Sequence, residues 1–365
     1  MSTSSIVGWV LAVTSNLLPS QSRTLAVLVA AAVRTERLNL ASIGRGMAGA
    51  VSAKHTIKRA WRFTCNRRVE VHQAMAVVVA KLARRRKRPL IVSLDWTDVR
   101  DLHTLMAAAC IGGRAVPLVW ASYSGASLRR SQNSLEERLL RTLRGLIPRS
   151  APVTILADRG FGRAEWAAIC RELEFHYVVR IKPDVTIACP RYRGVLSRYP
   201  TSKGMAHLLR GVDYRKDKRV RHNVAIRWRP DLPKARDEPW FLMTDLDAKA
   251  ERVCRLYGRR MSVEELFRDG KGKRNGQSLR DTRIGRSDRF DRLLLVAALA
   301  YLILAGVGLQ AKLDFAPSAW CTTRRPRECS VFTIGKAMID RLNCPPDQIL
   351  QMIRRATIEA GSKWG

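Results

Sequence analysis

The chain has 365 residues, 46% of them hydrophobic, so it is long enough to bury a substantial core and is not a disordered polypeptide. Lysine and arginine total 66 against 31 acidic residues, which gives a net charge of +35. This excess destabilises a compact protein unless a polyanion neutralises it, so it predicts nucleic-acid binding, with a solvated basic surface as the alternative. The eight cysteines form no CxxC pair and do not cluster with the six histidines, which argues against a zinc site.

Residues 1–83 are expected to form a helical DNA-binding region. Two short helices are predicted at 40–50 and 52–63, and the second carries four basic residues beside Ile57 and Trp61. Those basic residues are Lys54, Lys58, Arg59 and Arg62. A basic helix after a turn is typical of the reading helix of a helix-turn-helix, although a plain packed pair of helices fits the pattern equally well.

The basic run at residues 84–88 marks the boundary of a predicted core segment at residues 84–181. After Pro89 the hydrophobic pattern changes from helical to strand-like. The predicted order is three strands, a helix, a strand, a helix and a strand. A helical crossover after three antiparallel strands puts the fourth strand beside the first. Asp95 on the first strand and Asp158 at the end of the fourth would then stand side by side. This order resembles the ribonuclease-H-like fold, a mixed five-stranded sheet with helices.

Three further regions follow this core segment. Residues 182–245 contain short strand-like runs between Arg and Pro and predict a β-rich insertion subdomain. Residues 246–312 are expected to return to the core as helices, and 313–365 to form a C-terminal helical segment. The uncharged stretch 293–309 is about as short as a membrane-spanning helix can be. One such stretch in a basic chain favours a buried core helix over a membrane span.

A helical stripe of four residues carries the chemistry of the second half. Their spacing is Y-x2-R-x3-E-x6-K, and at about 100° per residue it puts all four on one face of one helix. The four residues are Tyr257, Arg260, Glu264 and Lys271. Glu265 would project from a different face and is the weaker carboxylate candidate. A solvated face with charge pairs four residues apart is the alternative reading.

The stripe in YGRRMSVEELFRDGK resembles the Y-R-E-K signature of the insertion-sequence-four family of bacterial DDE transposases. The segments SLDWTDV at Asp95 and ADRGFGR at Asp158 resemble the other two catalytic stretches of that family. The resemblance spans about residues 40–310, with 63 positions from Asp95 to Asp158 and 106 from there to Glu264. Two features depart from the family pattern. Trp-Thr-Asp-Val follows Asp95 in place of a shorter Thr-rich stretch, and the chain after residue 320 is short for a dimerisation domain.

The resemblance implies a DNA transposase that cuts and joins DNA with Asp95, Asp158 and Glu264 as catalytic and metal-binding residues. Oxygen-only carboxylate ligands suit Mg²⁺, with Mn²⁺ as a substitute, and two such ions can activate water and stabilise a leaving oxygen. Asp95 would bridge both ions, and each of the other carboxylates would hold one. Asp98 follows Asp95 by three residues, and strand alternation sends it to the opposite face.

The same resemblance assigns roles to residues around the carboxylates. Tyr257, Arg260 and Lys271 would contact the phosphates beside the cleaved bond. Trp240 would stack a base flipped from the duplex, which would permit a hairpin intermediate, although a core tryptophan on a strand is an equally good interpretation. Trp228 is the weaker aromatic candidate.

The expected partners are double-stranded DNA, as the element's terminal inverted repeats and the target. Two DNA ends must be brought together, which predicts a homodimer on DNA. The expected location is the bacterial cytoplasm, in association with the nucleoid. Two alternatives remain open: a ribonuclease-H-like nuclease without strand transfer, and a non-catalytic DNA-binding remnant of a mobile element. A membrane protein would rest on 293–309 alone.

Overall fold

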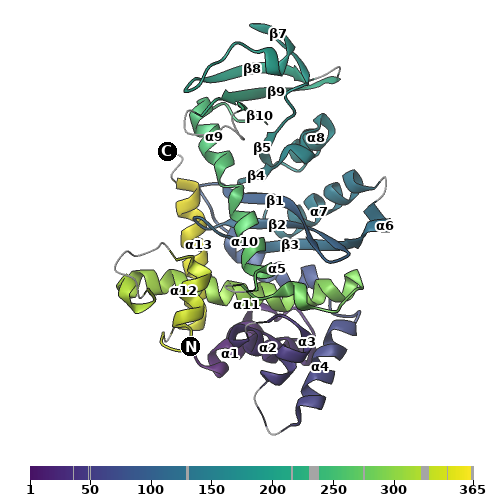
Figure 1. Cartoon of the computed structure of the whole chain (residues 1–365), viewed down its shortest axis with the longest axis vertical. Helices are drawn as coiled ribbons and strands as arrows, with labels where there is room; N and C mark the ends of the chain where they lie inside the picture. The colour runs from purple at the N-terminus through teal and green to yellow at the C-terminus, as the bar shows by residue number, and fades with distance from the viewer. Residues whose placement is uncertain are drawn as a thin grey trace.

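A computed structural model describes residues 1–35, 37–47, 49, 51–128, 131–214, 217–229, 238–273, 276–321, 329–342 and 344–362. The fold is mixed α/β, with one large sheet that runs through the middle and upper part of the molecule and helices packed around and below it (Figure 1). The sheet has ten strands in the order β3-β2-β1-β4-β5-β10-β9-β8-β6-β7. The architecture is therefore compatible with the ribonuclease-H-like fold.

The first half of the sheet has the predicted strand arrangement. Antiparallel strands β1, β2 and β3 come first, and β4 and β5 then run parallel to β1. Their bounds are Leu90–Val99, Leu102–Cys110, Ala115–Ser124, Val153–Ala157 and His176–Arg180. The crossover helices are α7 (Gln132–Leu146) and α8 (Ala164–Glu172), and the short α6 (Gly125–Leu128) follows β3.

The insertion extends this sheet instead of forming a sheet of its own. β10 pairs antiparallel with β5, β9 with β10 and β8 with β9, and the short β6 and β7 complete the far edge. Their bounds are Thr186–Cys189 (β6), Tyr192–Val195 (β7), Ala206–Tyr214 (β8), Asp217–Arg227 (β9) and Trp240–Thr244 (β10). Without β10, β5 would be an edge strand with unpaired backbone groups. The sheet is for this reason larger than the five strands expected.

The N-terminal region is helical as predicted and lies at the opposite end of the molecule from β6 and β7 (Figure 1). Its helices are α1 (Thr3–Val13), α2 (Pro19–Arg34), α3 (Leu40–Arg45), α4 (Ala53–Cys65) and α5 (Val71–Ala83). α3 and α4 pack closely because Gly44 has no side chain: a Cβ there would lie 2.6 Å from the Cα of Ile57. The basic residues predicted on the second helix lie on α4 and are exposed.

The remaining helices surround the 28-residue α11 (Ser287–Asp314), which packs against β3, α2, α4, α5 and two C-terminal helices. Those two are α12 (Val331–Met338) and α13 (Pro346–Ser362). Helices α9 (Ala250–Gly258) and α10 (Met261–Lys271) precede α11, and short 3₁₀ turns are η1 (Arg159–Phe161), η2 (Leu196–Arg198), η4 (Leu279–Asp281) and η5 (Pro317–Ala319).

α11 contains the apolar stretch that resembles a membrane span. This helix is long and apolar enough to cross a membrane, but 83% of its most apolar 18-residue stretch is buried inside the protein. It is therefore the buried core helix that the sequence favoured, around which both the N-terminal and C-terminal helices pack.

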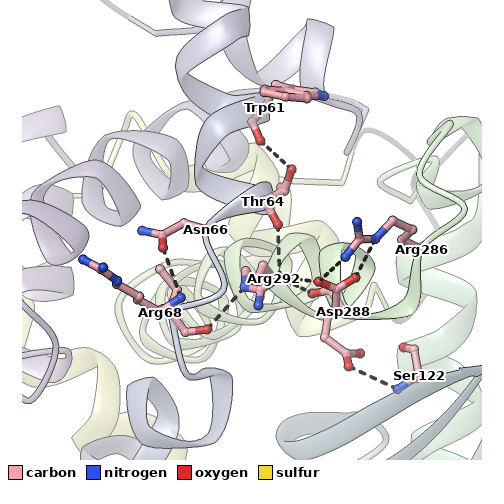
Figure 2. Close-up of polar contacts among 10 residues, drawn as sticks. Trp61, Thr64, Asn66, Arg68, Ser122, Arg286, Asp288 and Arg292 are labelled. Atoms are coloured by element: carbon pink, nitrogen blue, oxygen red, sulfur yellow. Dashed lines mark hydrogen bonds and ion pairs between the residues drawn. The ribbon is translucent and has the colours of Figure 1, made fainter.

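A buried arginine joins the N-terminal helices to α11 (Figure 2). Arg292 donates from Nη1 to the Thr64 carbonyl at 3.2 Å and from Nε to the Val69 carbonyl at 3.3 Å, so it satisfies the backbone between α4 and α5. Its charge is balanced by Asp288, one turn earlier, at 3.2 Å. Because the buried guanidinium bonds both the backbone after α4 and Asp288 of α11, it fixes the position of α4 relative to the start of α11.

The crossing of α11 and α12 depends on two glycines. A Cβ at Gly308 would lie 1.8 Å from the Val331 carbonyl oxygen, and one at Gly335 would lie 1.9 Å from the Leu304 carbonyl oxygen. The two backbones therefore touch, and no larger residue fits without moving a helix.

We expect Gly335→Ala to lower the free energy of unfolding by about 2 kcal/mol or more, because it forces α12 away from α11. Gly8→Ala is the matched control: Gly8 lies within α1 with open space around it, so alanine there should stabilise its helix by about 1 kcal/mol. Urea unfolding followed by circular dichroism measures both. Equal stability of the two variants would contradict the close crossing.

Candidate active site

Two aspartates lie side by side on adjacent parallel strands, Asp95 within β1 and Asp158 directly after the end of β4. Leu94 of β1 pairs with Ala157 of β4, so Asp95 and Asp158 are the next residue along each strand. The pKa of Asp95 is raised to about 6, chiefly by burial, with a lowering by Arg260 and smaller raising contributions from the nearby charges of Asp158 and Glu264. The three carboxylates predicted as a set are therefore within electrostatic reach of one another.

Asp98 lies on the other face of β1, as strand alternation predicted. Its side chain is 66% exposed and bonds to His103 Nδ1 at 2.6 Å, whereas that of Asp95 is 14% exposed. Asp98 is thus mainly exposed and bound to His103, whereas Asp95 is mostly buried against Arg260, so Asp95 is the candidate that the fold supports.

Arg260 lies between the carboxylates of β1 and α10. Its Nη1 donates to Asp95 Oδ2 at 3.0 Å, and its Nη2 donates to Glu264 Oε1. The arginine side chain is itself 12% exposed, which strengthens both interactions because water screens them weakly. A single guanidinium thus compensates two of the three converging negative charges.

Asp158 also caps the turn that follows β4. Its Oδ1 accepts a hydrogen bond from the Gly160 N–H at 2.8 Å and begins η1. Strand-end aspartates often cap turns, and Asp158 does so, but this bond uses one oxygen atom. The cap fixes the orientation of the carboxylate beside Asp95.

The prediction that one continuous helix carries Tyr257, Arg260, Glu264 and Lys271 is wrong. α9 ends at Gly258 and α10 begins at Met261. Between the two helices the backbone hydrogen bonds join residues three positions apart, as in a 3₁₀-helix. The Arg260 N–H donates to the Tyr257 carbonyl, and the Val263 N–H donates to the Arg260 carbonyl. α9 packs on β5 and the insertion strands whereas α10 packs on β1, β2 and β3, and one straight helix cannot follow both ends of a twisted sheet.

The broken helix still gathers the predicted phosphate-binding residues. The Arg260 guanidinium lies 6.0 Å from the centre of the Tyr257 ring. Lys271 Nζ lies 2.8 Å from the Thr97 hydroxyl, and Thr97 follows Asp95 by two residues on the same face of β1. Burial lowers the pKa of Lys271. Two cations and a phenol therefore border the carboxylates.

Glu265 has a structural role, which supports Glu264 as the carboxylate that faces the site. Glu265 forms ion pairs with Arg114 at 3.2 Å and with Arg268 at 2.8 Å. Arg114, from the turn between β2 and β3, also contacts Asp269 at 2.8 Å, and the Tyr301 hydroxyl of α11 donates to Asp269 at 2.9 Å. These contacts anchor α10 on the side away from Glu264.

The two tryptophans of the insertion differ in position. Trp240 begins β10 and is half-buried, with its ring edge-on to Tyr257 at 5.2 Å and the Arg229 guanidinium 5.8 Å from its ring centre. The Trp228 backbone pairs with Gly204 and Met205 at the end of the β8–β9 pair. Trp240 is therefore the one packed against a residue of the site.

Glu136 is a member of the site that the sequence analysis missed. This α7 side chain is 1% exposed, and its carboxylate accepts from Trp96 Nε1 at 3.1 Å and from Arg163. Trp96 adjoins Asp95, and Arg163 donates to the Gly160 carbonyl at 2.9 Å, in the turn that Asp158 caps. The buried Glu136 carboxylate thus holds in place both the neighbour of Asp95 and the turn that Asp158 caps.

A helical signal was available for Glu136. It lies three, four and seven positions before Leu139, Leu140 and Leu143, all of which are buried, so it falls on the apolar face of α7. Glu238, just before β10, had no comparable signal. It forms ion pairs with Arg159 at 2.6 Å and with Arg180, which attach the Asp158 turn to the insertion.

In the described part of the chain, no three acidic, histidine or cysteine side chains are grouped as they would be around a metal ion. The chemistry of the donor set nonetheless fits a hard divalent cation, because the charges of Asp158 and Glu264 both act on Asp95 and all three donors are carboxylates. The side chain of Glu264 is 40% exposed and is held by Arg260.

We expect Glu136→Ala to lower the free energy of unfolding by about 3 kcal/mol, because it leaves the Arg163 guanidinium without its carboxylate and the Trp96 indole N–H without its acceptor. Glu137→Ala is the matched control, since the neighbouring glutamate is exposed and pairs with Arg141 on the surface; it should change stability by less than about 1 kcal/mol. Thermal and urea unfolding compare the two. Similar losses would show that Glu136 has no special supporting role.

A comparison with protein families assigns the sheet and the first helices that follow it to one family. The model of the transposase DDE domain family matches residues 87–303, a segment from just before β1 to the middle of α11 that contains all three carboxylates. No curated protein matches the chain at a significant level. Because the matched segment is more than half of the chain, this protein belongs to the family of transposases with a DDE domain.

Proposed function

We propose that this chain is the transposase of an insertion sequence, of the insertion-sequence-four type, that binds the element's ends and catalyses Mg²⁺-dependent cleavage and strand transfer. The observation that carries the proposal is the bridge formed by Arg260 between Asp95 and Glu264, with Asp158 beside them. Arg260 and Glu264 of the Y-R-E-K stripe thus meet Asp95 of the first strand, although the stripe and this strand are far apart in the sequence.

Transposase DDE domains generally use divalent metals, and Asp95, Asp158 and Glu264 are the residues that would hold them here. When bound, two Mg²⁺ ions would supply the charge that activates the attacking oxygen and stabilises the leaving one. The same carboxylates would serve both reactions, first with water and then with a 3′-hydroxyl of DNA as the nucleophile.

Cations of the site would position the DNA. Arg260 and Lys271 lie on the same side of the sheet as Asp95, where they can neutralise the phosphates on each side of the cleaved bond. The Tyr257 hydroxyl can donate to a phosphate oxygen. Trp240 packs against Tyr257 and is only half-buried, so part of its ring can stack an extruded base, as a hairpin intermediate requires.

The reaction on two element ends requires that two copies of the active site act together, so we propose a homodimer on DNA. The partners would be the terminal inverted repeats and the target duplex, and the protein would act in the bacterial cytoplasm at the nucleoid. The net charge of +35 supports binding to DNA of any sequence, from which specific ends are selected.

We expect Asp95→Asn, Asp158→Asn and Glu264→Gln each to reduce cleavage of the element's ends by at least about a thousandfold, because loss of one metal ligand removes several kcal/mol of transition-state stabilisation. Asp98→Asn is the control, since that carboxylate lies on the opposite face. A supercoiled plasmid that carries both flanks of the coding region reports nicking and joining as separate products. Nicking without any joined product would favour a nuclease, and full activity of Glu264→Gln would refute its assignment.

Binding of Mg²⁺ should depend on pH around the raised pKa of Asp95. Below about 6 this carboxyl holds a proton that must leave before a cation binds, so affinity should fall as the pH decreases through that value. Calorimetric titration of the DNA-free protein with Mg²⁺ between pH 5 and about 8 tests this. Asp95→Asn should bind weakly at every pH; an affinity of the unmodified protein that does not change with pH would contradict the prediction.

A further inference from the structure

A second basic surface lies outside the candidate active site. A groove of about 870 Å³ separates α3 and α4 from the segment that joins α10 to α11. Its charged lining residues are Arg37, Lys273, Asp281, Arg283 and Arg289. Four cations face one carboxylate, and that carboxylate, Asp281, already lies 4.0 Å from Arg37. The groove therefore has an excess of positive charge that a polyanion would neutralise.

Two of these cations have no counter-charge among the residues that the structure describes. Lys273 and Arg283 are exposed, and no ion pair between described residues includes either of them. Arg289 is half-buried, and its Nε is buried without a hydrogen-bond acceptor in the described structure. A buried donor without an acceptor costs free energy, which a ligand oxygen in the groove would recover.

The groove also contains an exposed aromatic residue. Trp61 of α4 is 47% exposed, and the Arg289 guanidinium lies 5.4 Å from its ring centre. A large exposed indole costs free energy in water unless a partner covers it. An aromatic face beside an arginine is suited to a nucleotide, which offers a flat base or sugar next to a phosphate.

The position of the groove relates it to the candidate active site. Lys273 follows Lys271 by two residues, and Lys271 contacts Thr97 beside the carboxylates. On the opposite wall, α4 contributes Ile57 and Trp61 to the groove and exposes four basic residues beside it: Lys54, Lys58, Arg59 and Arg62. Arg292 holds α4 in place against α11 (Figure 2). The groove therefore lies between two basic segments, one that leads from the carboxylates and one on α4.

We propose that this groove binds the element-end DNA between the active site and α4, with Lys273, Arg283 and Arg289 on the phosphates and Trp61 against a sugar or base. The inference rests on the proposed function, because it takes the ligand to be the DNA that is cut. An acidic protein segment would also satisfy the cations, but it would leave the indole and its arginine without a flat partner.

The test measures binding and is independent of cleavage. Asp95→Asn is used as the background, without metal, so that no DNA is cut. Fluorescence anisotropy follows a labelled duplex from the DNA that flanks the coding region, over a series of salt concentrations. Lys273→Ala with Arg283→Ala is compared with Lys249→Ala and Lys312→Ala together, which removes two exposed charges elsewhere. Trp61→Ala and Trp61→Phe are measured in the same way.

The groove double variant should bind at least about tenfold more weakly, and the slope of log affinity against log salt should fall by about 2, since two phosphate contacts are lost. The control double variant should leave the slope unchanged. Trp61→Ala should weaken binding by about tenfold with the slope retained, and Trp61→Phe should restore part of the loss.

Equal effects of the groove and control variants would overturn the proposal, because they would mean that only total charge matters. The proposal would also be overturned, in favour of an acidic protein partner, by a pair of results: the groove variants bind DNA normally, and polyglutamate binds the groove. The result is separate from the proposed chemistry: catalytic variants that stay active would refute the triad yet leave the groove data valid. Unfolding curves of each variant confirm that a loss of binding is not a loss of fold.

Discussion

Mutual repulsion of three carboxylates is the constraint that shapes this protein. Asp95, Asp158 and Glu264 converge from two strands and a helix, and burial of Asp95 makes the repulsion stronger because water screens it less. Arg260 offsets this cost in the free protein by bonding two of the three. In the function that we propose, metal ions would supply a stronger positive charge to the carboxylates, and Arg260 would be available to DNA phosphates.

Such a site requires a rigid base, and the fold supplies it through buried ionic contacts on the far side of each carboxylate. Glu136 connects the neighbours of Asp95 and Asp158, and Arg114 holds Glu265 and through it the helix of Glu264. In each contact the two partners lie on different elements: Glu136 of α7 contacts Trp96 of β1, and Arg114 of the β2–β3 turn contacts Glu265 of α10. Removing one partner would leave an unpaired charge, so these contacts specify one arrangement of the strands and α10 more than they add net stability.

Periodicity predicted the strand order and the face of β1 that carries Asp95, because alternation and helical crossovers depend on local sequence alone. It failed for the break between α9 and α10. Tyr257 and Glu264 have ideal helical spacing, and the break follows from the different parts of the sheet that the two helices cover. The attachment of β10 to β5 and the pairing of Glu238 with Arg159 also depend on residues far apart in sequence, which no local pattern encodes.

The N-terminal helices are joined to the rest of the fold through a buried arginine. The sequence left open whether the basic helix belongs to a helix-turn-helix or to a plain packed pair of helices. In the structure Arg292 fixes the place of α4: the guanidinium is buried, bonds the backbone on both sides of Asn66, and is balanced by Asp288 of its own helix. α11 in turn packs on β3, in the same sheet as Asp95. Because these contacts are continuous, DNA bound at α4, as we propose, would have a fixed position relative to the carboxylates, and the protein core would set the distance between the bound sequence and the cut.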